Sequence, residues 1–461
     1  MALRSFELEP SRENLLNTLW KDVLDRNKSV WQFARFCDAQ EGKCSIAVDA
    51  QWGAGKTFFV RHVQLLMDSF NHFTRGVTEE ESTKIRNVFS RFIGTGENAV
   101  SFNPEVCVYY DAWSNDNDGD PVLSLVYEII KSTAQNYSFE KSKDCIKLVS
   151  SIADFFAGRN VAEIVELVRG DDPLSELKSQ KDIHDLVADF LDSLLYEQGN
   201  RLIIIIDELD RCKPEYAVRL LERIKHYFTN DRITFVFSVN IDALQHTVKR
   251  YYGEGFDACR YLDRFFDYRI TLPPANMLNY YGTLGLDNRY AFESVCKSVI
   301  EYCHFELREI EKFYRIAKIA AYEPTHHRTY WGFSEGEALQ FSLCIVVPIV
   351  IGLRMSNRVL YNDFIHGRNS EPLIQVLGSG DIAKGYCSSL LNQTETYGTP
   401  KNQEKNVLLT DKLDLVYKAL FEENGGTSGR EIRVGECTFS RQTREAVMRA
   451  TSLLSEFASF E

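Results

Sequence analysis

The chain has 461 residues, of which 44% are hydrophobic and 12% aromatic, an ordinary globular composition that suffices for two or three domains. Its 53 basic and 66 acidic residues give a formal net charge of -13, so a broad electrostatic attraction to DNA or RNA is not expected. The eleven cysteines include no C-x-x-C pair, and no signal peptide is recognisable. We therefore expect reduced thiols, a cytoplasmic protein and no structural zinc site.

Hydrophobic periodicity divides the chain into an α/β part and a helical part. Residues 11–40 carry two amphipathic helical patterns. Strand-like runs follow at 44–49, 106–111, 201–207, 233–240 and 268–272. Because helical segments separate these runs, we expect a mostly parallel sheet of about five strands covered by helices on both faces. After Pro273 and Pro274 the pattern is mainly helical, which predicts an α/β domain over residues 1–274 and a mainly helical domain over 275–461.

The most apolar window of the chain starts at Ala338 and reads ALQFSLCIVVPIVIGL. It is short for a membrane-spanning helix and contains Gln340 and Pro348. We therefore interpret it as a buried helical segment of a protein that does not use a membrane.

A glycine-rich segment, AQWGAGKT, joins the first strand-like run to an amphipathic helical one. It matches the phosphate-binding pattern G-x-x-x-x-G-K-[ST], with the small residue Ala50 in the first glycine position. The pattern predicts nucleotide contacts from the loop and the helix start, with Lys56 reaching the β- and γ-phosphates and the Thr57 hydroxyl ligating Mg²⁺. The candidate nucleotide-binding residues are Gly53, Ala54, Gly55, Lys56, Thr57 and Phe58. The alternative is a glycine-rich turn with an unrelated lysine.

A second motif, RLIIIIDELDRC, lies about 150 residues further on. Its aliphatic run predicts a strand buried on both faces, with Asp207 at the carboxyl end beside the phosphate loop, where it would bind Mg²⁺ through water. Glu208 follows, where many NTPases hold the base that activates water. The alternative for this acidic pair is a solvated turn. For Asp210 and Arg211, a structural pair that holds the turn is as plausible as a direct role.

Together these segments resemble the KAP family of P-loop NTPases, within the STAND and AAA-like group. The resemblance rests on WGAGKT, IIIIDELDRC, EYAVRLLERIKHYF, ITFVFSVN and YLDRFFDYRITLPP, and it extends from about Glu13 to Pro274. It implies a P-loop domain with an extra strand between the two nucleotide motifs, ATP as the nucleotide, and in bacteria a frequent association with resistance to phage or plasmids. Many members carry transmembrane helices between the motifs, but residues 58–200 contain no long uncharged apolar run, so this chain resembles a soluble member.

Four further residues are candidates through the resemblance. Asn240 ends the fourth strand, where the family often has Asp, and it either orients the attacking water or caps the next helix. Arg264 is a candidate to reach the γ-phosphate of the same or a neighbouring subunit, and Arg308 resembles a nucleotide sensor. Surface or capping roles are the alternatives for both arginines. Trp113 matches a family tryptophan, which we interpret as a buried aromatic.

The sequence therefore predicts an ATP-binding and ATP-hydrolysing switch that acts through a homo-oligomer or a partner protein. A nucleic-acid-acting ATPase is a second hypothesis, with the basic segment 430–449 as the contact surface. A nucleotide-binding scaffold with little hydrolysis is a third. The acidic pair argues against the scaffold, and Glu208 also argues against a small-molecule kinase.

Overall fold

The computed structural model describes residues 9–73, 76–93, 101–133, 180–286, 291–321, 337–379, 384–385, 387, 402–422, 431–435 and 437–454. The chain divides into two compact units, one formed by Glu9–Met277 and the other mainly by residues of Leu278–Glu461. Each unit is considered separately below.

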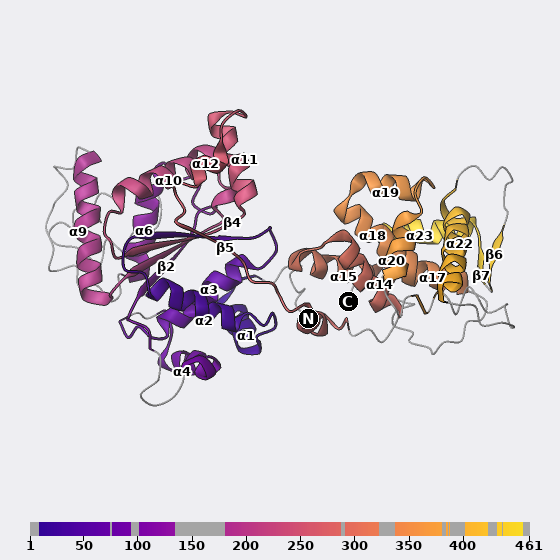
Figure 1. Ribbon diagram of the computed structural model, residues 1–461, viewed down its shortest axis with the longest axis horizontal. Helices are drawn as coiled ribbons and strands as arrows, with labels where there is room; N and C mark the ends of the chain where they lie inside the picture. Colours follow the sequence, from indigo (N-terminus) through magenta and orange to yellow (C-terminus); the bar gives the residue numbers. More distant parts are fainter. Residues whose placement is uncertain are drawn as a thin grey trace. The chain divides into compact units, whose positions relative to one another are not determined.

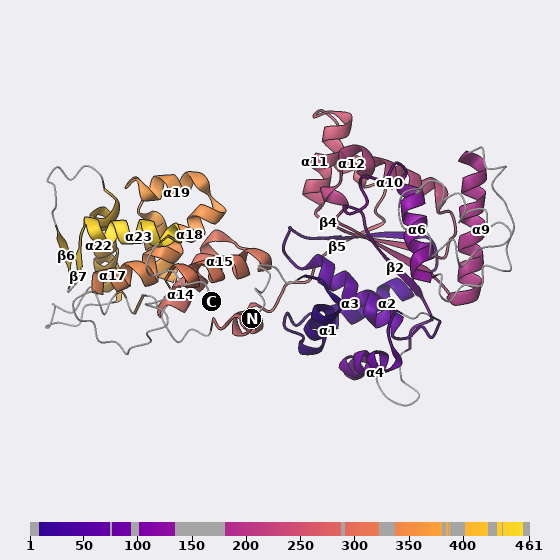
Figure 2. The same cartoon turned by 180° about the vertical axis from the view of Figure 1, so that it is seen from behind.

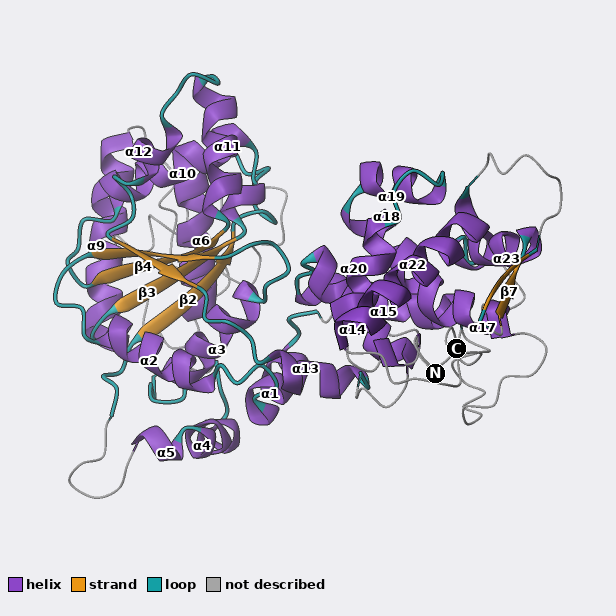
Figure 3. Ribbon diagram, turned by 45° about the vertical axis from the view of Figure 1, so that its right-hand side comes forward, coloured by secondary structure: helices purple, strands orange, loops and turns teal. Residues whose placement is uncertain are grey.

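The first unit is built around a five-stranded sheet, in which every pair of neighbouring strands is parallel (Figure 3). The strand order is β2-β3-β4-β1-β5, so β4 lies between the strands that carry the two nucleotide motifs, as the family resemblance implied. All five predicted strands are present, at β1 (Cys44–Asp49), β2 (Val106–Asp111), β3 (Leu202–Asp207), β4 (Ile233–Val239) and β5 (Tyr268–Thr271). The fold class predicted from the sequence is confirmed.

Burial explains why the central strands read as unbroken apolar runs. Every residue of β3 and β4 is buried, because helices cover both faces of a parallel sheet. Alternate residues of one strand enter different cores: Ile46 packs into one apolar cluster and Ala47 into the other.

Two layers of helices cover the sheet (Figures 1 and 2). The face that includes Ile46 packs against α1 (Arg12–Lys21), α2 (Asn27–Asp38), α3 (Lys56–Asp68), α4 (Glu79–Val88) and α5 (Ser90–Ile93). The face that includes Ala47 packs against α6 (Pro121–Thr133), α9 (Gln180–Gln198), α10 (Pro214–Tyr227), α11 (Ile241–Tyr252) and α12 (Ala258–Leu262). A short 3₁₀ turn, η3 (Leu209–Arg211), follows β3. Since the carboxyl ends of parallel strands share one edge of the sheet, the loops after β1, β2, β3 and β4 lie close together.

The second unit is mainly helical. It contains most of α13 (Met277–Leu284), together with α14 (Ala291–Cys303), α15 (Leu307–Ala320), α17 (Glu337–Phe341), the π-helix η4 (Ser342–Val346), α18 (Val347–Ser356), α19 (Arg358–Ile365), α20 (Glu371–Ser379), α22 (Asn402–Phe421) and α23 (Arg441–Thr451). Two short antiparallel strands, β6 (Ile432–Val434) and β7 (Cys437–Phe439), form a hairpin before α23.

The apolar window that starts at Ala338 forms a continuous helical segment of this unit. Among the described residues, Ala338–Ser356 is the one stretch that is long and apolar enough to span a membrane, but 78% of its window is buried inside the protein. Phe341, Ile345 and Val350 are fully buried there, as expected for a core helix.

Candidate functional site

The phosphate loop turns through two glycines between β1 and α3. Gly53 and Gly55 have φ angles of 86° and 89°, a left-handed conformation that glycine adopts without steric cost. Helix α3 begins at Lys56, at the position that the motif predicts. Because the first N–H groups of a helix have no intrahelical partner, those of Lys56, Thr57 and Phe58 form the donor set that suits a phosphate.

Lys56 is folded back over its own loop. Its Nζ donates to the carbonyl oxygen of Ala50 at 2.6 Å and to that of Gln51 at 3.1 Å. Burial lowers the pKa of Lys56, and the carboxylates of Asp210, Asp207 and Asp49 oppose that shift. The ammonium group is thus held at the loop by groups that a more strongly charged ligand can replace.

Asp207 joins the two nucleotide motifs. Its Oδ2 accepts a hydrogen bond from Thr57 Oγ1 at 2.7 Å and another from the Tyr109 hydroxyl at 3.0 Å. Asp207 is only 1% exposed, and burial raises the pKa of its carboxyl group. The adjacent hydroxyl and carboxylate offer two hard oxygen ligands, the type of metal ligand that Mg²⁺ prefers.

Glu208 has a strained backbone beside this pair. Its φ of 59° lies in the left-handed region, which is costly for a residue with a Cβ. Burial raises the pKa of Glu208 to about 7, while Arg211 opposes that shift. Arg211 Nη1 donates to Glu208 Oε2 at 2.8 Å. A carboxyl with a pKa near neutrality is well suited to accept a proton from water.

Arg211, the partner of Glu208, lies beside two indole rings, and we call Trp52, Trp113 and Arg211 the tryptophan–arginine cluster. The Arg211 guanidinium carbon lies 6.0 Å from the ring centroid of Trp52 and 5.4 Å from that of Trp113. Trp113 is 50% exposed, so the prediction of a buried aromatic is wrong. The indole is retained at the surface because it covers a cation, an interaction that a hydrophobicity pattern does not reveal.

Asn240, between β4 and α11, contacts both α11 and the phosphate loop. Its Oδ1 accepts from the backbone N–H of Ala243, which caps α11, and its Nδ2 donates to Gln51 Oε1 at 2.9 Å in the phosphate loop. The capping alternative therefore describes a contact that is present, and the second contact places the amide next to the loop.

The family model of the KAP family P-loop domain matches residues 33–289, more than half of the chain. The chain belongs to the KAP family. No curated protein matches the chain.

Solved structures similar to this KAP protein include ORC proteins of two organisms. The Aeropyrum pernix ORC2 protein, in ADPNP–ADP complexes, is 13% identical, with 97% of this chain and 96% of that chain covered and a TM-score of 0.31. A chain of Drosophila ORC bound to GC-rich DNA and Cdc6 is 10% identical, with 98% of this chain and 65% of that chain covered and a TM-score of 0.32.

The two remaining candidate arginines lie away from the phosphate loop or in the other unit. Arg264 is exposed in the turn before β5, where Lys225 Nζ donates to its carbonyl oxygen. Since β5 runs parallel to β1 and Asp267 N donates to the carbonyl of Ser45, Arg264 lies at the amino edge of the KAP sheet. The six residues of β1 separate that edge from the phosphate loop, about 20 Å. Arg308 is exposed near the start of α15, in the second unit.

Two residues of the KAP site were not predicted. Tyr109 could have been found from the alternation of side chains along β2. Val108 faces one side of the sheet, and Tyr109 faces the other side together with Cys107. Arg26 could not, because no motif surrounds it. It is 8% exposed in the turn before α2, and its Nη1 donates to the carbonyl oxygen of Ala54 in the phosphate loop at 2.9 Å.

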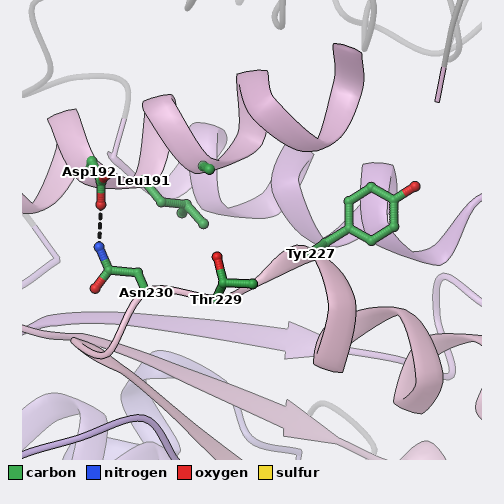
Figure 4. A pocket seen from close by; sticks show the side chains of 6 residues that line it. Leu191, Asp192, Tyr227, Thr229 and Asn230 are labelled. Atoms are coloured by element: carbon green, nitrogen blue, oxygen red, sulfur yellow. Dashed lines mark hydrogen bonds between the residues drawn. The ribbon is translucent and has the colours of Figure 1, made fainter. Parts of the chain in front are cut away.

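A small cavity of about 100 Å³ lies elsewhere in the KAP domain (Figure 4). Leu191 and Asp192 on α9 form one side, and Tyr227, Thr229 and Asn230 form the other. Asn230 precedes β4, so the cavity is at the amino edge of the sheet and belongs to a different region from the phosphate loop.

Proposed function

We propose that this KAP protein binds ATP with Mg²⁺ and hydrolyses it, and that the cycle switches a conformation or an assembly. The observation that carries the proposal is the 2.7 Å contact between Thr57 and Asp207, which joins motifs 150 residues apart beside an amine-bearing phosphate loop. Nucleotide binding is the part that family membership supports directly.

The residues fit the predicted ligands. Thr57 and Asp207 would hold Mg²⁺, which when bound neutralises charge on the phosphates. The loop N–H groups would bind phosphate oxygens, and Lys56 would leave the carbonyls of Ala50 and Gln51 to reach them. Glu208 would accept the proton of the attacking water, which favours hydrolysis over a passive scaffold.

Binding is tested by replacing Lys56 with Ala. Mg-ATP at a hundredfold excess over its dissociation constant stabilises a protein by about 2.7 kcal/mol, and we expect this thermal shift in the wild type and a much smaller one in Lys56→Ala. Equal shifts in the two proteins would refute the assignment of Lys56. Parallel titrations with GTP measure the nucleotide preference.

Turnover is tested separately by Glu208→Gln. The amide cannot accept a proton from water, so we expect unchanged nucleotide binding and a loss of roughly 10² to 10⁴ in hydrolysis. Wild-type turnover in Glu208→Gln would remove Glu208 as the base and make Asp210 the candidate.

Nucleic acid and phage defence are narrower proposals with their own tests. The described part of the basic segment forms a hairpin and α23, with Arg433 and Arg449 exposed. DNA-stimulated turnover that weakens with salt and is lost in Arg433→Ala with Arg449→Ala would support a nucleic-acid role. Plaque counts on cells that carry the wild type or Lys56→Ala would test a defence role.

A further inference from the structure

Tyr109 reaches the KAP site from a strand that belongs to neither nucleotide motif. It lies on β2 and is half-buried, on the side of the sheet that α3 covers. Its hydroxyl contacts Asp207 at the carboxyl end of β3, and Thr57 at the start of α3 contacts the same carboxylate oxygen. Three elements of the fold therefore meet at Asp207 Oδ2.

The register of the sheet explains why Tyr109 reaches Asp207. β2 runs parallel to β3, and Tyr109 lies opposite Ile205, two residues before Asp207. Because side chains alternate along a strand, Tyr109, Ile205 and Asp207 face the same layer of helices. The offset of two residues is about 7 Å along the strand, and a tyrosine is long enough to span it.

The ring of Tyr109 is held from α3. The guanidinium carbon of Arg61, one helical turn after Thr57, lies 4.3 Å from the centroid of this ring. A planar guanidinium stacks favourably on an aromatic face. The helix that carries Thr57 thus also restrains the phenol that contacts Asp207.

The contacts of Asp207 give the Tyr109 hydroxyl a defined chemical role. An ionised carboxylate only accepts hydrogen bonds, so Tyr109 donates to Oδ2 at 3.0 Å, while the backbone N–H of Glu208 donates to Oδ1 at 3.0 Å. Thr57 is itself a predicted Mg²⁺ ligand, whereas Tyr109 is not. Hydrogen-bond donors behind a ligating carboxylate orient it, and their loss typically lowers metal affinity by about 10- to 100-fold.

We propose that Tyr109 is a positioning residue that orients the Asp207 carboxylate for Mg²⁺, and that Arg61 holds the Tyr109 ring in place. This inference rests on the proposed function, because it concerns the same metal site. The hydroxyl acts on the metal through Asp207. Its removal should therefore weaken metal binding and leave the binding of metal-free nucleotide unchanged.

Tyr109→Phe tests the role of the hydroxyl, because it keeps the ring and its contact with Arg61. The measurement uses MnCl₂ as a paramagnetic substitute for Mg²⁺, a non-hydrolysable ATP analogue and protein in excess over the analogue. We expect electron paramagnetic resonance to give a dissociation constant for Mn²⁺ that is about 10- to 100-fold higher in Tyr109→Phe than in the wild type. In EDTA, both proteins should bind the analogue equally. Equal Mn²⁺ affinities would overturn the proposal.

Tyr110→Phe is the matched control. Tyr110 is the next residue of β2, and its side chain enters the opposite core, where its hydroxyl donates to Ser124 at 2.9 Å and contacts that of Tyr216. The variant removes a buried hydroxyl from the same strand, so it reproduces a general loss of stability, which urea unfolding measures. Its Mn²⁺ affinity should equal that of the wild type. An equal loss in both variants would assign the effect to the strand and refute the proposal.

The wild type separates failure of this inference from failure of the proposed function. If the wild type binds the analogue and Mn²⁺, and Tyr109→Phe binds both equally well, the inference alone is refuted. If the wild type binds no Mn²⁺ in the presence of the analogue, the proposed metal site fails, and the role of Tyr109 fails with it. A weakened Mn²⁺ site in Tyr109→Phe, with unchanged binding of the analogue in EDTA, supports both.

Discussion

Asp68, at the end of α3, is a buried carboxyl outside the nucleotide site. Asp68 is 7% exposed, and its Oδ1 atom has no hydrogen-bond partner among the residues that the structure describes. Burial raises the pKa of Asp68 to about 7, although Arg61 and Arg12 act in the opposite direction. The folded protein therefore binds this proton more tightly than the unfolded chain, in which the pKa is near 3.8.

The sign of this shift gives a prediction for Asp68→Asn. The proton bound by Asp68 stabilises the folded protein fully below about pH 4, and this stabilisation is lost as the pH rises through 7. At 1.36 kcal/mol per pKa unit, the loss in unfolding free energy is at most about 4 kcal/mol. An amide does not titrate, so Asp68→Asn does not lose this stability as the pH rises. The unfolding free energy of Asp68→Asn minus that of the wild type should therefore become more positive from pH 5 to pH 8. Urea unfolding at the two pH values measures it. Glu79→Gln, an exposed change on α4, is the control, and a difference independent of pH would contradict the prediction.

At the scale of elements, the start of α11 is the point where a cap and the phosphate loop meet. Replacing Asn240 with Ala removes the cap at Ala243 N and should lower the unfolding free energy by about 1 kcal/mol. Asn240→Ser keeps a capping oxygen and should recover most of that loss. Chemical unfolding of the three proteins checks the order, and equal stability of the Ala and Ser variants would rule out the cap. Reduced turnover in Asn240→Ser at wild-type stability would assign the amide to the site, through Gln51.

The strands could be predicted to within about one residue, because apolar runs such as Leu202–Ile206 have few alternatives to a buried parallel strand. The phosphate loop was equally clear, since the positive φ angles fall at Gly53 and Gly55 of the motif. The tryptophan–arginine cluster could not be predicted, because its three members come from different loops. Half-exposed Trp113 shows the reason: its partner is a cation about a hundred residues away, and a single sequence contains no record of that contact.

At the scale of the whole molecule, Arg264 offers a test of whether the active unit is an assembly. Its location at the amino edge of the sheet separates it from its own phosphate loop, so any contribution to hydrolysis would be made to a neighbouring copy. Arginines supplied in this way can contribute about 10³ to 10⁵ in rate.

We therefore expect Arg264→Ala to bind ATP normally and to hydrolyse it poorly, with wild-type activity per molecule rising with protein concentration. A mixture of Arg264→Ala with Lys56→Ala should regain turnover, because an intact loop on one chain then meets an intact arginine on another. Arg260→Ala, an exposed change on the neighbouring helix α12, is the control. Concentration-independent activity without rescue in the mixture would assign Arg264 to a structural role.

The strand order has a consequence for folding during synthesis on the ribosome. β1 is synthesised first, yet its two neighbours in the sheet, β4 and β5, begin only at Ile233 and Tyr268. At about 5–20 residues per second, the interval before β4 emerges is on the order of 10 to 40 s. For that time the apolar β1 has no native strand to pair with, and its open edges offer a template to other nascent chains. The early segment that carries the phosphate loop therefore stays open to pairing with other chains until β4 has been synthesised.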